Sequence, residues 1–373
     1  MSKILVFGDF TTEERGKDAV LKGYAVDDRI TELIKSSDYS LVNMEAPIAD
    51  EKDKPIEKFG PNLKTIPETV TYLSSLGIKG VTLANNHFFD YGISGVEKTL
   101  GALEKAGLDY VGGGRTEFER KKILYISLPD CQVAILNYCE HEFSVHDKVG
   151  SNPISPISFY YDIQETKLHA DVVLTIVHGG HEGYQLPSPR MQELYRFMID
   201  CGSNIVINHH QHCYSGFEQY HNGHIYYGLG NFFFDSMTEN DRLWEEGYFL
   251  SIAIDNKQVV DIQILPYVQC EMQKAHVRLM TDSESSSFIK SLERINRIIA
   301  DRGALNKYFC EFCDSKRNNY IVPLYPYSNR YLCALAKRNI LPSFVTNRRK
   351  RMLLNYVQCE AHRDVLEKSL RQK

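Results

Sequence analysis

The chain has 373 residues, of which 43% are hydrophobic and 24% charged, with a formal net charge of −5 and a pI of about 6.2. This composition is ordinary for a soluble globular protein, and it argues against a nucleic-acid-binding protein, whose binding domain would normally be basic. No run approaches the roughly 18 apolar residues of a membrane span, and Met1–Lys3 leads directly into a predicted strand. Nine scattered cysteines without an export signal are typical of reduced thiols, so we expect a cytoplasmic protein.

The first part of the chain alternates predicted strands and helices. The strands are expected at 3–8, 39–43 and 79–84, and the helices at 27–36, 67–76 and 93–106. A long loop over 46–63 separates the second strand from the following helix. A hairpin is expected next, with strands at 122–127 and 132–138 around Pro129-Asp130.

The middle of the chain is richer in strands. Residues 162–168 are expected to form a short helix, and 171–177 the most apolar strand. Helix 188–201 opens with Ser188-Pro189, an N-cap followed by proline at the first helical position. Strand 204–208 follows, and then short strands at 215–220, 223–228, 247–255 and 258–265. The βαβ half and the hairpin-rich half together predict an α/β protein with mixed sheets.

The composition shifts after about residue 270, where helices are predicted at 283–301, 328–340 and 347–371. We therefore divide the chain into 1–268 and a mainly helical extension, 269–373. The run Asn347–Arg351 is basic; it fits a solvated helix face, or alternatively a patch for an anionic partner or membrane surface. Residues 270–373 are a candidate lid, oligomer interface or partner-docking arm.

Five predicted strands end in side chains that bind metals. In chain order these are Asp9; Asn43 and Glu45; Asn86, His87 and Asp90; His178; and His209, His210 and His212. The carboxyl ends of strands in an open α/β sheet form the rim at which ligands bind. One such ending is ordinary, but five with oxygen or imidazole donors are hard to explain by core packing.

Mixed imidazole and carboxylate ligands suit Mn, Fe and Zn ions. Two such ions about 3.5–4 Å apart can activate a water and stabilise both the attacking and the leaving oxygen of a displacement. A pair of ions needs about six protein donors, including a bridging carboxylate. The sequence supplies six: Asp9, Glu45, Asn86, His178, His210 and His212. We therefore predict a site for two divalent metal ions.

His87 has a different predicted role from its neighbour Asn86. If Asn86 binds metal, the next side chain points elsewhere and can face the substrate. Asp90, three residues on, could orient the imidazole and raise its pKa, which makes His87 a candidate general acid for the leaving group. The alternative is that His87 only caps a turn.

The motifs resemble those of the CapA proteins of capsule and poly-γ-glutamate synthesis. Residues 84–92 read ANNHFFDYG and resemble the signature ANNHxxDYG. Gly8-Asp9 and Asn43-x-Glu45-x-Pro47 match the first two family motifs. The segments His178–Glu182, Asn208–His212 and Tyr226–Phe232 are similar to HWGxE, GxHPH and YSLGNF. The matches keep family order and spacing over roughly residues 3–235.

The resemblance implies a calcineurin-like metallophosphoesterase fold, a four-layer α/β/β/α sandwich of two mixed sheets. It implies the same six metal ligands with His87 beside them. Asn43, Glu182 and Asn231 are expected to order the ligands.

Four departures from known motifs stand out. Other metallophosphoesterases carry Asp-x-His in the first motif, whereas Phe10-Thr11 follows Asp9, so one histidine ligand is missing. Glu45 replaces their second-motif aspartate, as it does in CapA proteins. Gly179 replaces the family tryptophan and is expected to open space in the pocket, and Asn208 replaces the glycine of GxHPH. His181 and His209 are extra imidazoles that could replace the missing ligand or contact an anionic substrate.

The predicted function is a cytoplasmic metal-dependent hydrolase of the CapA type. An activated water would attack a phosphoester, or an amide in a γ-glutamyl-like polymer. The alternative is a non-catalytic component that binds an anionic polymer or a synthase partner during capsule assembly. A ligase role is disfavoured because the sequence contains no Gly-x-x-x-x-Gly-Lys-Ser/Thr loop.

Overall fold

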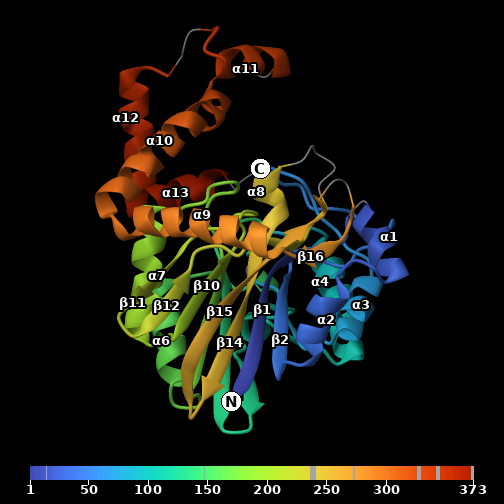
Figure 1. The fold of residues 1–373 in the computed structure, drawn as a ribbon. Coiled ribbons are helices and arrows are strands. Elements are labelled where there is room, and N and C mark those ends of the chain that lie inside the picture. The colour runs from blue at the N-terminus through green and yellow to red at the C-terminus, as the bar shows by residue number, and fades with distance from the viewer. Residues whose placement is uncertain are drawn as a thin grey trace. The chain divides into compact units, whose positions relative to one another are not determined.

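A computed structural model of the chain describes residues 1–13, 15–146, 148–235, 241–271, 274–325, 329–341 and 345–370 (Figure 1). The contacts divide the chain into two compact units, Met1–Asn306 and Lys307–Lys373. Among the helices in these ranges, none combines the length and the apolar composition that a membrane crossing requires.

The larger sheet of the first unit is mixed. Its strands are β1 (Ser2–Phe10), β2 (Tyr39–Met44), β3 (Gly80–Thr82), β4 (Asp109–Val111), β13 (Asn231–Phe233), β14 (Glu246–Asp255), β15 (Gln258–Gln269) and β16 (Val277–Leu279). They run in the order β16-β15-β14-β1-β2-β3-β4, and β13 pairs with the end of β1. Strands β1 to β4 are parallel, whereas β14, β15 and β16 are joined by antiparallel ladders. The parallel strands therefore present their carboxyl ends at one edge.

The second sheet is also mixed and has the order β11-β12-β10-β9-β7-β6. Its strands are β6 (Leu124–Leu128), β7 (Cys131–Cys139), β9 (Val172–His178), β10 (Ile205–His209), β11 (Phe217–Tyr220) and β12 (Gly223–Tyr226). The four central strands are parallel, with antiparallel β6 and β11 at the two edges. A small pair, β5 (Gly113–Gly114) and β8 (Gly150–Ser151), lies apart from both sheets.

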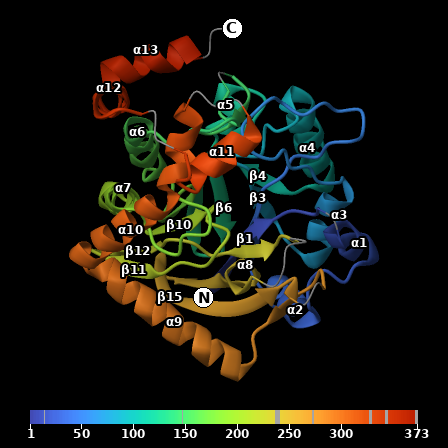
Figure 2. The ribbon, with the colours of Figure 1, turned by 90° about the horizontal axis from the view of Figure 1, so that it is seen from above.

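Helices cover the outer face of each sheet (Figure 2). The helices of the first half are α1 (Arg15–Lys22), α2 (Asp28–Lys35), α3 (Glu68–Leu76), α4 (Gly92–Ala106) and α5 (Glu117–Arg120). They are followed by α6 (Pro156–Thr166), α7 (Pro189–Cys201), α8 (Arg242–Glu245) and α9 (Asp282–Ala300). Helices α1 to α4 share a core with the outer face of the larger sheet, and α6 and α7 pack on the second sheet. The expected four-layer α/β/β/α sandwich is confirmed.

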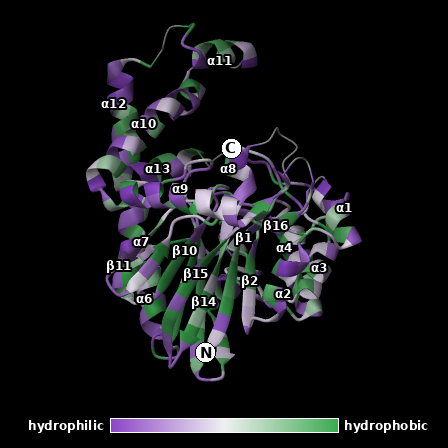
Figure 3. Ribbon diagram, viewed as in Figure 1, coloured by the Kyte–Doolittle hydropathy of each residue, from purple (hydrophilic) through white to green (hydrophobic). Residues whose placement is uncertain are grey.

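The core lies between the two sheets as well as beneath the helices. Ile4, Val6 and Leu41 of the larger sheet belong to the same buried cluster as Val133 and Leu174 of the second sheet. The central strands are apolar on both faces because each sheet is covered on both sides, and Figure 3 shows them mostly hydrophobic. The sandwich thus holds the strand ends in fixed positions.

Local signals explain several helix boundaries. Ser188 caps α7 by accepting a hydrogen bond from the Met191 amide, with Pro189 at the first helical position. Helix α4 ends at Gly107, whose φ of 68° suits a glycine in the left-handed conformation. Several short elements, including α1, β13 and β16, were not predicted, because their runs are too short for a periodic pattern.

The first unit extends beyond the sequence-based boundary at residue 268, which falls within β15. Helix α9 starts with a capping box formed by Thr281 and Glu284. Its buried side chains Phe288, Leu292 and Ile295 join the core that contains the second sheet. Part of the predicted helical extension therefore belongs to the sandwich.

The second unit is helical. Helix α10 (Arg302–Ile321) leads into it and is followed by a short 3-10 turn, η2 (Val322–Leu324). Helices α11 (Arg330–Lys337), α12 (Asn347–Gln358) and α13 (Glu360–Leu370) complete the unit. The prediction of a single helix over 347–371 is wrong, because Cys359 separates α12 from α13. Residues 328 and 371, the ends of two predicted helices, lie outside the described residues.

Candidate metal centre

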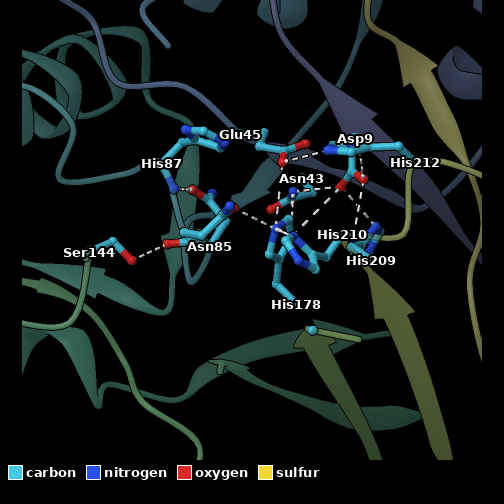
Figure 4. A network of polar contacts seen from close by, with 12 residues as sticks. Asp9, Asn43, Glu45, Asn85, His87, Ser144, His178, His209, His210 and His212 are labelled. Atoms are coloured by element: carbon cyan, nitrogen blue, oxygen red, sulfur yellow. Dashed lines mark hydrogen bonds and ion pairs between the residues drawn. The ribbon is translucent and has the colours of Figure 1, made fainter. Parts of the chain in front are cut away.

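The predicted ligands lie at the carboxyl ends of strands from both sheets. Asp9 is near the end of β1 and pairs in register with Asn43 of β2, while Glu45 follows β2 directly. In the second sheet His178 ends β9 and pairs in register with His209, which ends β10. The two sheets face each other, so these strand ends converge (Figure 4).

The converging side chains form two groups that share one carboxylate. Donor atoms of Glu45, His178 and His210 all lie within 4.8 Å of one another, and so do those of Asp9, Glu45 and His212. All five residues are buried. A carboxylate common to both groups is the arrangement that a pair of bridged metal ions requires.

Asn86 completes the group on the His178 side. Its Oδ1 lies 2.9 Å from Nε2 of His178, which is 3.1 Å from Nδ1 of His210. Ligands of one ion at bond lengths of about 2.1 Å lie about 3 Å apart, so these separations fit a common ion. The structure thus brings together all six predicted ligands.

The carboxylate of Glu45 has unmet hydrogen-bonding capacity. Its Oε1 lies 3.5 Å from Nε2 of His178 and 3.5 Å from Nε2 of His212, and neither oxygen has a hydrogen-bond partner. Burial and the neighbouring charge of Asp9 raise the pKa of Glu45 well above its ordinary value. A buried carboxylate without donors is stabilised by a bound cation, so the residues present fit divalent metal ions.

The pKa of Asp9 is shifted in the opposite direction to that of Glu45. Burial raises its pKa, but His209, His178 and His212 outweigh burial and hold that pKa below its ordinary value. Its Oδ2 is 3.6 Å from Nδ1 of His212, whereas its Oδ1 accepts a 2.7 Å hydrogen bond from Nδ2 of Asn43. Asn43 therefore fixes the carboxylate and leaves the other oxygen directed toward the ligand group.

The loop after β10 carries its histidines on strained backbone. His210 has a φ of 88° and His212 a φ of 54°, both in the left-handed region that non-glycine residues rarely adopt. Such residues cost of order 1–3 kcal/mol each and persist where the surrounding structure holds them. One such contact is the 3.2 Å hydrogen bond from the His210 amide to Asp9 Oδ2. The loop geometry brings two imidazoles from one loop to two ligand groups.

Asn231 holds His212 in place. Its Oδ1 lies 2.9 Å from Nδ1 of His212, and its Nδ2 donates to the His212 carbonyl at 3.2 Å. Asn231 begins β13 and pairs in register with Asp9. With Nδ1 engaged, Nε2 is the His212 nitrogen that faces Glu45. An outer partner of this kind fixes ring orientation and tautomer in metal sites.

His87 belongs to a separate, fully bonded cluster beside the ligands. Its Nδ1 is 2.7 Å from Oδ2 of Asp90, and Lys58 contacts both His87 Nδ1 at 3.2 Å and Asp90 Oδ1. Oδ2 of Asp90 also accepts a 2.7 Å hydrogen bond from the Leu63 amide. Asp90 orients His87, as the spacing of the two residues suggested.

The pKa of His87 departs from the sequence-based expectation. Burial lowers it more than Asp90 raises it, and Lys58 lowers it further. Asp90 raises the pKa as its spacing suggested, but burial of the imidazole outweighs that effect, and Lys58, which sequence reasoning missed, adds a smaller lowering. The side chain of Lys58 is only 4% exposed although it comes from a long loop without a periodic pattern. Nothing in the spacing of that loop indicated an inward-facing lysine.

Glu182 and His181 lie outside the ligand groups. Glu182 is exposed and affects Glu45 and His210 only through its charge. His181 is partly buried, packs its ring edge-on against Tyr184, and has its pKa lowered by burial. Neither side chain belongs to the donor groups found among the described residues.

Comparison with known proteins identifies the family to which the chain belongs. Residues 3–236 match the family model described as bacterial capsule synthesis protein PGA_cap. The chain belongs to this family.

Two curated relatives share about a third of their residues with the matched region. The capsule biosynthesis protein CapA of Bacillus anthracis is 34% identical over 216 residues, covering 55% of this chain and 53% of that protein. The PGA biosynthesis protein CapA of Bacillus subtilis is 33% identical over 229 residues, covering 60% and 59%. The match thus spans somewhat over half the length of these curated relatives.

Solved structures of lower similarity include phosphoesterases. One is described as a novel phosphatase from Mycoplasma pneumoniae, with 14% identity and a TM-score of 0.46, covering 72% of this chain and 93% of that chain. Another is a 5'-nucleotidase from Candida albicans, with 10% identity and a TM-score of 0.41, covering 86% and 59%.

The residues at which this chain departs from its family pattern have structural explanations. The expectation that Gly179 opens space in the pocket is wrong, because a Cβ built there would lie 2.7 Å from Cγ of Glu140. Glu140 follows β7, accepts a 3.1 Å hydrogen bond from the Gly180 amide, and pairs with Arg190. Its side chain occupies the space beside Gly179.

Asn208 and His209, the last two residues of β10, have distinct contacts. Asn208 is buried and bonds to the carbonyls of Gly179 and Tyr227, so it ties β10 to both neighbouring segments. His209 is also buried, with Nδ1 3.4 Å from Oδ1 of Asp9. It therefore contacts the Asp9 oxygen that Asn43 binds and does not join either donor group found among the described residues.

Proposed function

We propose that this capsule synthesis protein is a metal-dependent hydrolase that acts on a phosphoester. The observation that carries the proposal is the position of Glu45, whose two buried oxygens lack hydrogen-bond partners between two sets of imidazole and carboxylate donors. Divalent ions bound there would activate water and polarise the scissile group. The metals would be Mn, Fe or Zn, since all three accept this mixture of ligands.

Other residues of the site would orient the ligands and transfer the proton. Asn43 and Asn231 would hold Asp9 and His212 in their binding orientations. His87 would exchange a proton with the leaving oxygen through Nε2, because its Nδ1 is engaged by Asp90. Lys58 would hold Asp90 in place. General acid–base help of this kind contributes typically about 10²–10⁴-fold in rate.

The substrate would be an anionic phosphoester or an anionic polymer of capsule or poly-γ-glutamate metabolism. The names of the curated relatives place those proteins in capsule and PGA biosynthesis. The donor set favours the phosphoester, because two ions can contact attacking and leaving oxygens of an in-line displacement.

The test measures metal content and turnover together. Untagged protein, purified without chelator, is analysed for metals and assayed with bis-p-nitrophenyl phosphate with and without added Mn²⁺. We expect close to two ions per chain and turnover that His210→Ala reduces by about 10³-fold or more, because a direct ligand is lost. His169→Ala is the matched control, since the exposed side chain of His169 contacts Glu165 and Tyr125 and belongs to neither donor group.

The opposite result would support a different function. If wild-type protein retains fewer than one ion per chain and shows no turnover even with Mn²⁺, the domain is better described as a binding or assembly component. Such a component would hold an anionic polymer or a synthase partner and perform no hydrolysis.

A further inference from the structure

The two compact units have opposite charge. Residues 307–373 contain 14 Lys and Arg against five Asp and Glu, a formal net charge of +9. Residues 1–306 contain 29 against 43, a net charge of −14. The modest charge of the whole chain therefore conceals a strongly basic helical unit, whose field attracts anionic partners.

The basic unit also exposes many large apolar side chains. Its described part has 11 of them: Tyr308, Tyr320, Leu324, Tyr331, Leu332, Ile340, Met352, Leu354, Val357, Val365 and Leu370. The buried hydrophobic residues in the same part are Val322, Ala336 and Val345. Apolar exposure on this scale in so small a unit indicates an interaction surface.

Helix α12 combines both properties. Its first turns carry Arg348, Arg349, Lys350 and Arg351, and no side chain in the described residues forms an ion pair with these four. At 100° per residue, Met352, Leu353, Leu354, Tyr356 and Val357 fall on one side of the helix. Arg348, Arg351, Asn355 and Gln358 fall on the other, whereas Arg349 and Lys350, both in the first turn, fall within the apolar arc. Helix α12 has no buried residue among those described, and Met352, Leu354 and Val357 are 44%, 54% and 60% exposed.

We infer that the helical unit docks the protein on an anionic lipid surface through α12. A helix with basic residues and an exposed apolar side lies in the interface of a bilayer, where acyl chains cover the apolar side chains and the long arginine and lysine side chains extend to the anionic headgroups. A soluble acidic polymer would satisfy the charges but leave Met352, Leu354 and Val357 in water. Lipid matches both halves of the surface, so lipid is the occupant that the observations favour.

The experiment is co-sedimentation of the full chain with vesicles. Vesicles of phosphatidylcholine with 30% phosphatidylglycerol are compared with vesicles of phosphatidylcholine alone, at 0.1 M and 0.5 M NaCl. We expect binding to the anionic vesicles at 0.1 M, at least tenfold weaker binding at 0.5 M, and none to the neutral vesicles. No sedimentation with anionic vesicles at 0.1 M would overturn the proposal.

Two variants separate charge from apolar contact. A quadruple variant with Arg348→Gln, Arg349→Gln, Lys350→Gln and Arg351→Gln should bind at least tenfold more weakly than wild type. A variant with Met352→Ser, Leu354→Ser and Val357→Ser should also lose binding while its charge is unchanged. The matched control removes four exposed cations of the first unit, with Arg29→Gln, Lys35→Gln, Lys105→Gln and Lys122→Gln, and should bind as wild type.

The outcomes distinguish lipid from other anionic partners. If the serine variant binds vesicles as tightly as wild type, or if the control variant loses binding equally, docking by α12 is refuted. Binding to soluble poly-glutamate without binding to vesicles refutes it as well. Circular dichroism and thermal melting of each variant show whether the unit remains folded. His210→Ala should bind vesicles as wild type, so this test does not depend on the proposed hydrolase activity.

Discussion

Two neighbouring buried clusters differ in how their polar groups are satisfied. Around Glu45, both carboxylate oxygens lack hydrogen-bond partners, although four metal-binding side chains surround them. Around Asp90, one oxygen contacts Lys58 and the other contacts His87 and the Leu63 amide. A buried polar group without a partner costs about 1–3 kcal/mol, so natural sites retain such groups where a ligand completes them. The first cluster therefore has bonding capacity that the proposed ions would fill, and the second is satisfied by its own side chains.

The change with the largest expected effect is Glu45→Gln, which removes the carboxylate common to both donor groups. We expect loss of both ions and a fall in turnover of about 10³-fold or more, since neither group retains its bridging ligand. In the metal-free protein the same change should be stabilising by about 1–3 kcal/mol near neutral pH, because glutamine is buried without a change of protonation, whereas Glu45 must take up a proton on folding.

The sign of the pH dependence follows from the raised pKa of Glu45. The neutral form is favoured in the folded state, so the stability from Glu45 is fully present below its ordinary pKa of 4.5 and is lost as pH rises through the raised value. The gain from Glu45→Gln should therefore grow from pH 4 to pH 7.5. Thermal melts in chelator measure it, with Glu165→Gln as the exposed control. Retention of two ions, or a lower Tm at every pH, would contradict the role given to Glu45.

Asp90→Asn tests the complete cluster and should have the second-largest effect. We expect the ions to remain and turnover to fall by about 10²-fold, because His87 loses the carboxylate that orients it. The variant should also lose about 3–5 kcal/mol of stability, since the buried ammonium of Lys58 is left unpaired. Metal analysis, kcat/KM and thermal melting separate these effects.

A compensating change makes this test sharper. The double variant with Lys58→Met and Asp90→Asn should recover most of the stability and none of the turnover. If turnover returns with stability, Asp90 acts only through folding, and His87 needs no positioning carboxylate.

Gly179→Ala should have the smallest effect of the three changes. The added Cβ would lie 2.7 Å from Cγ of Glu140, so Glu140 must shift from the Gly180 amide, at a cost of about 1 kcal/mol. Glu140→Ala in the same protein removes the obstructing atoms and should restore the Tm. Gly101→Ala in α4 is the control, because no atom lies within 4 Å of a Cβ at that position. An unchanged Tm for Gly179→Ala would show that Glu140 moves freely.

The features that could be predicted from sequence are those that depend on residues close together in the chain. Apolar runs followed by an isolated polar residue located β1, β2 and β9 and the side chains at their ends. Those side chains meet because parallel strands present their carboxyl ends at one edge. The ANNHFFDYG motif placed His87 and Asp90 together, since a spacing of three residues keeps them within one turn.

The features that could not be predicted depend on contacts between distant segments. Lys58 reaches Asp90 from a loop without periodicity, and the burial of His87, with a smaller contribution from Lys58, outweighs the upward shift of the His87 pKa by Asp90. Glu140 occupies the space beside Gly179 from the segment after β7, 39 residues earlier. Neither residue differs in sequence from an ordinary exposed lysine or glutamate, so only the folded structure reveals its role.

The position of β1 in the larger sheet has a consequence for biosynthesis. This first strand pairs with β14, so that Ser2 lies opposite Ile254, and Asp9 meets His212 only when both segments are present. Contacts so distant in sequence form slowly and require most of the chain to have left the ribosome. The nascent N-terminal segment can therefore display Asp9 and Glu45 but not a complete ion-binding centre. The proposed ion-binding centre would therefore be completed only after β14 has emerged from the ribosome.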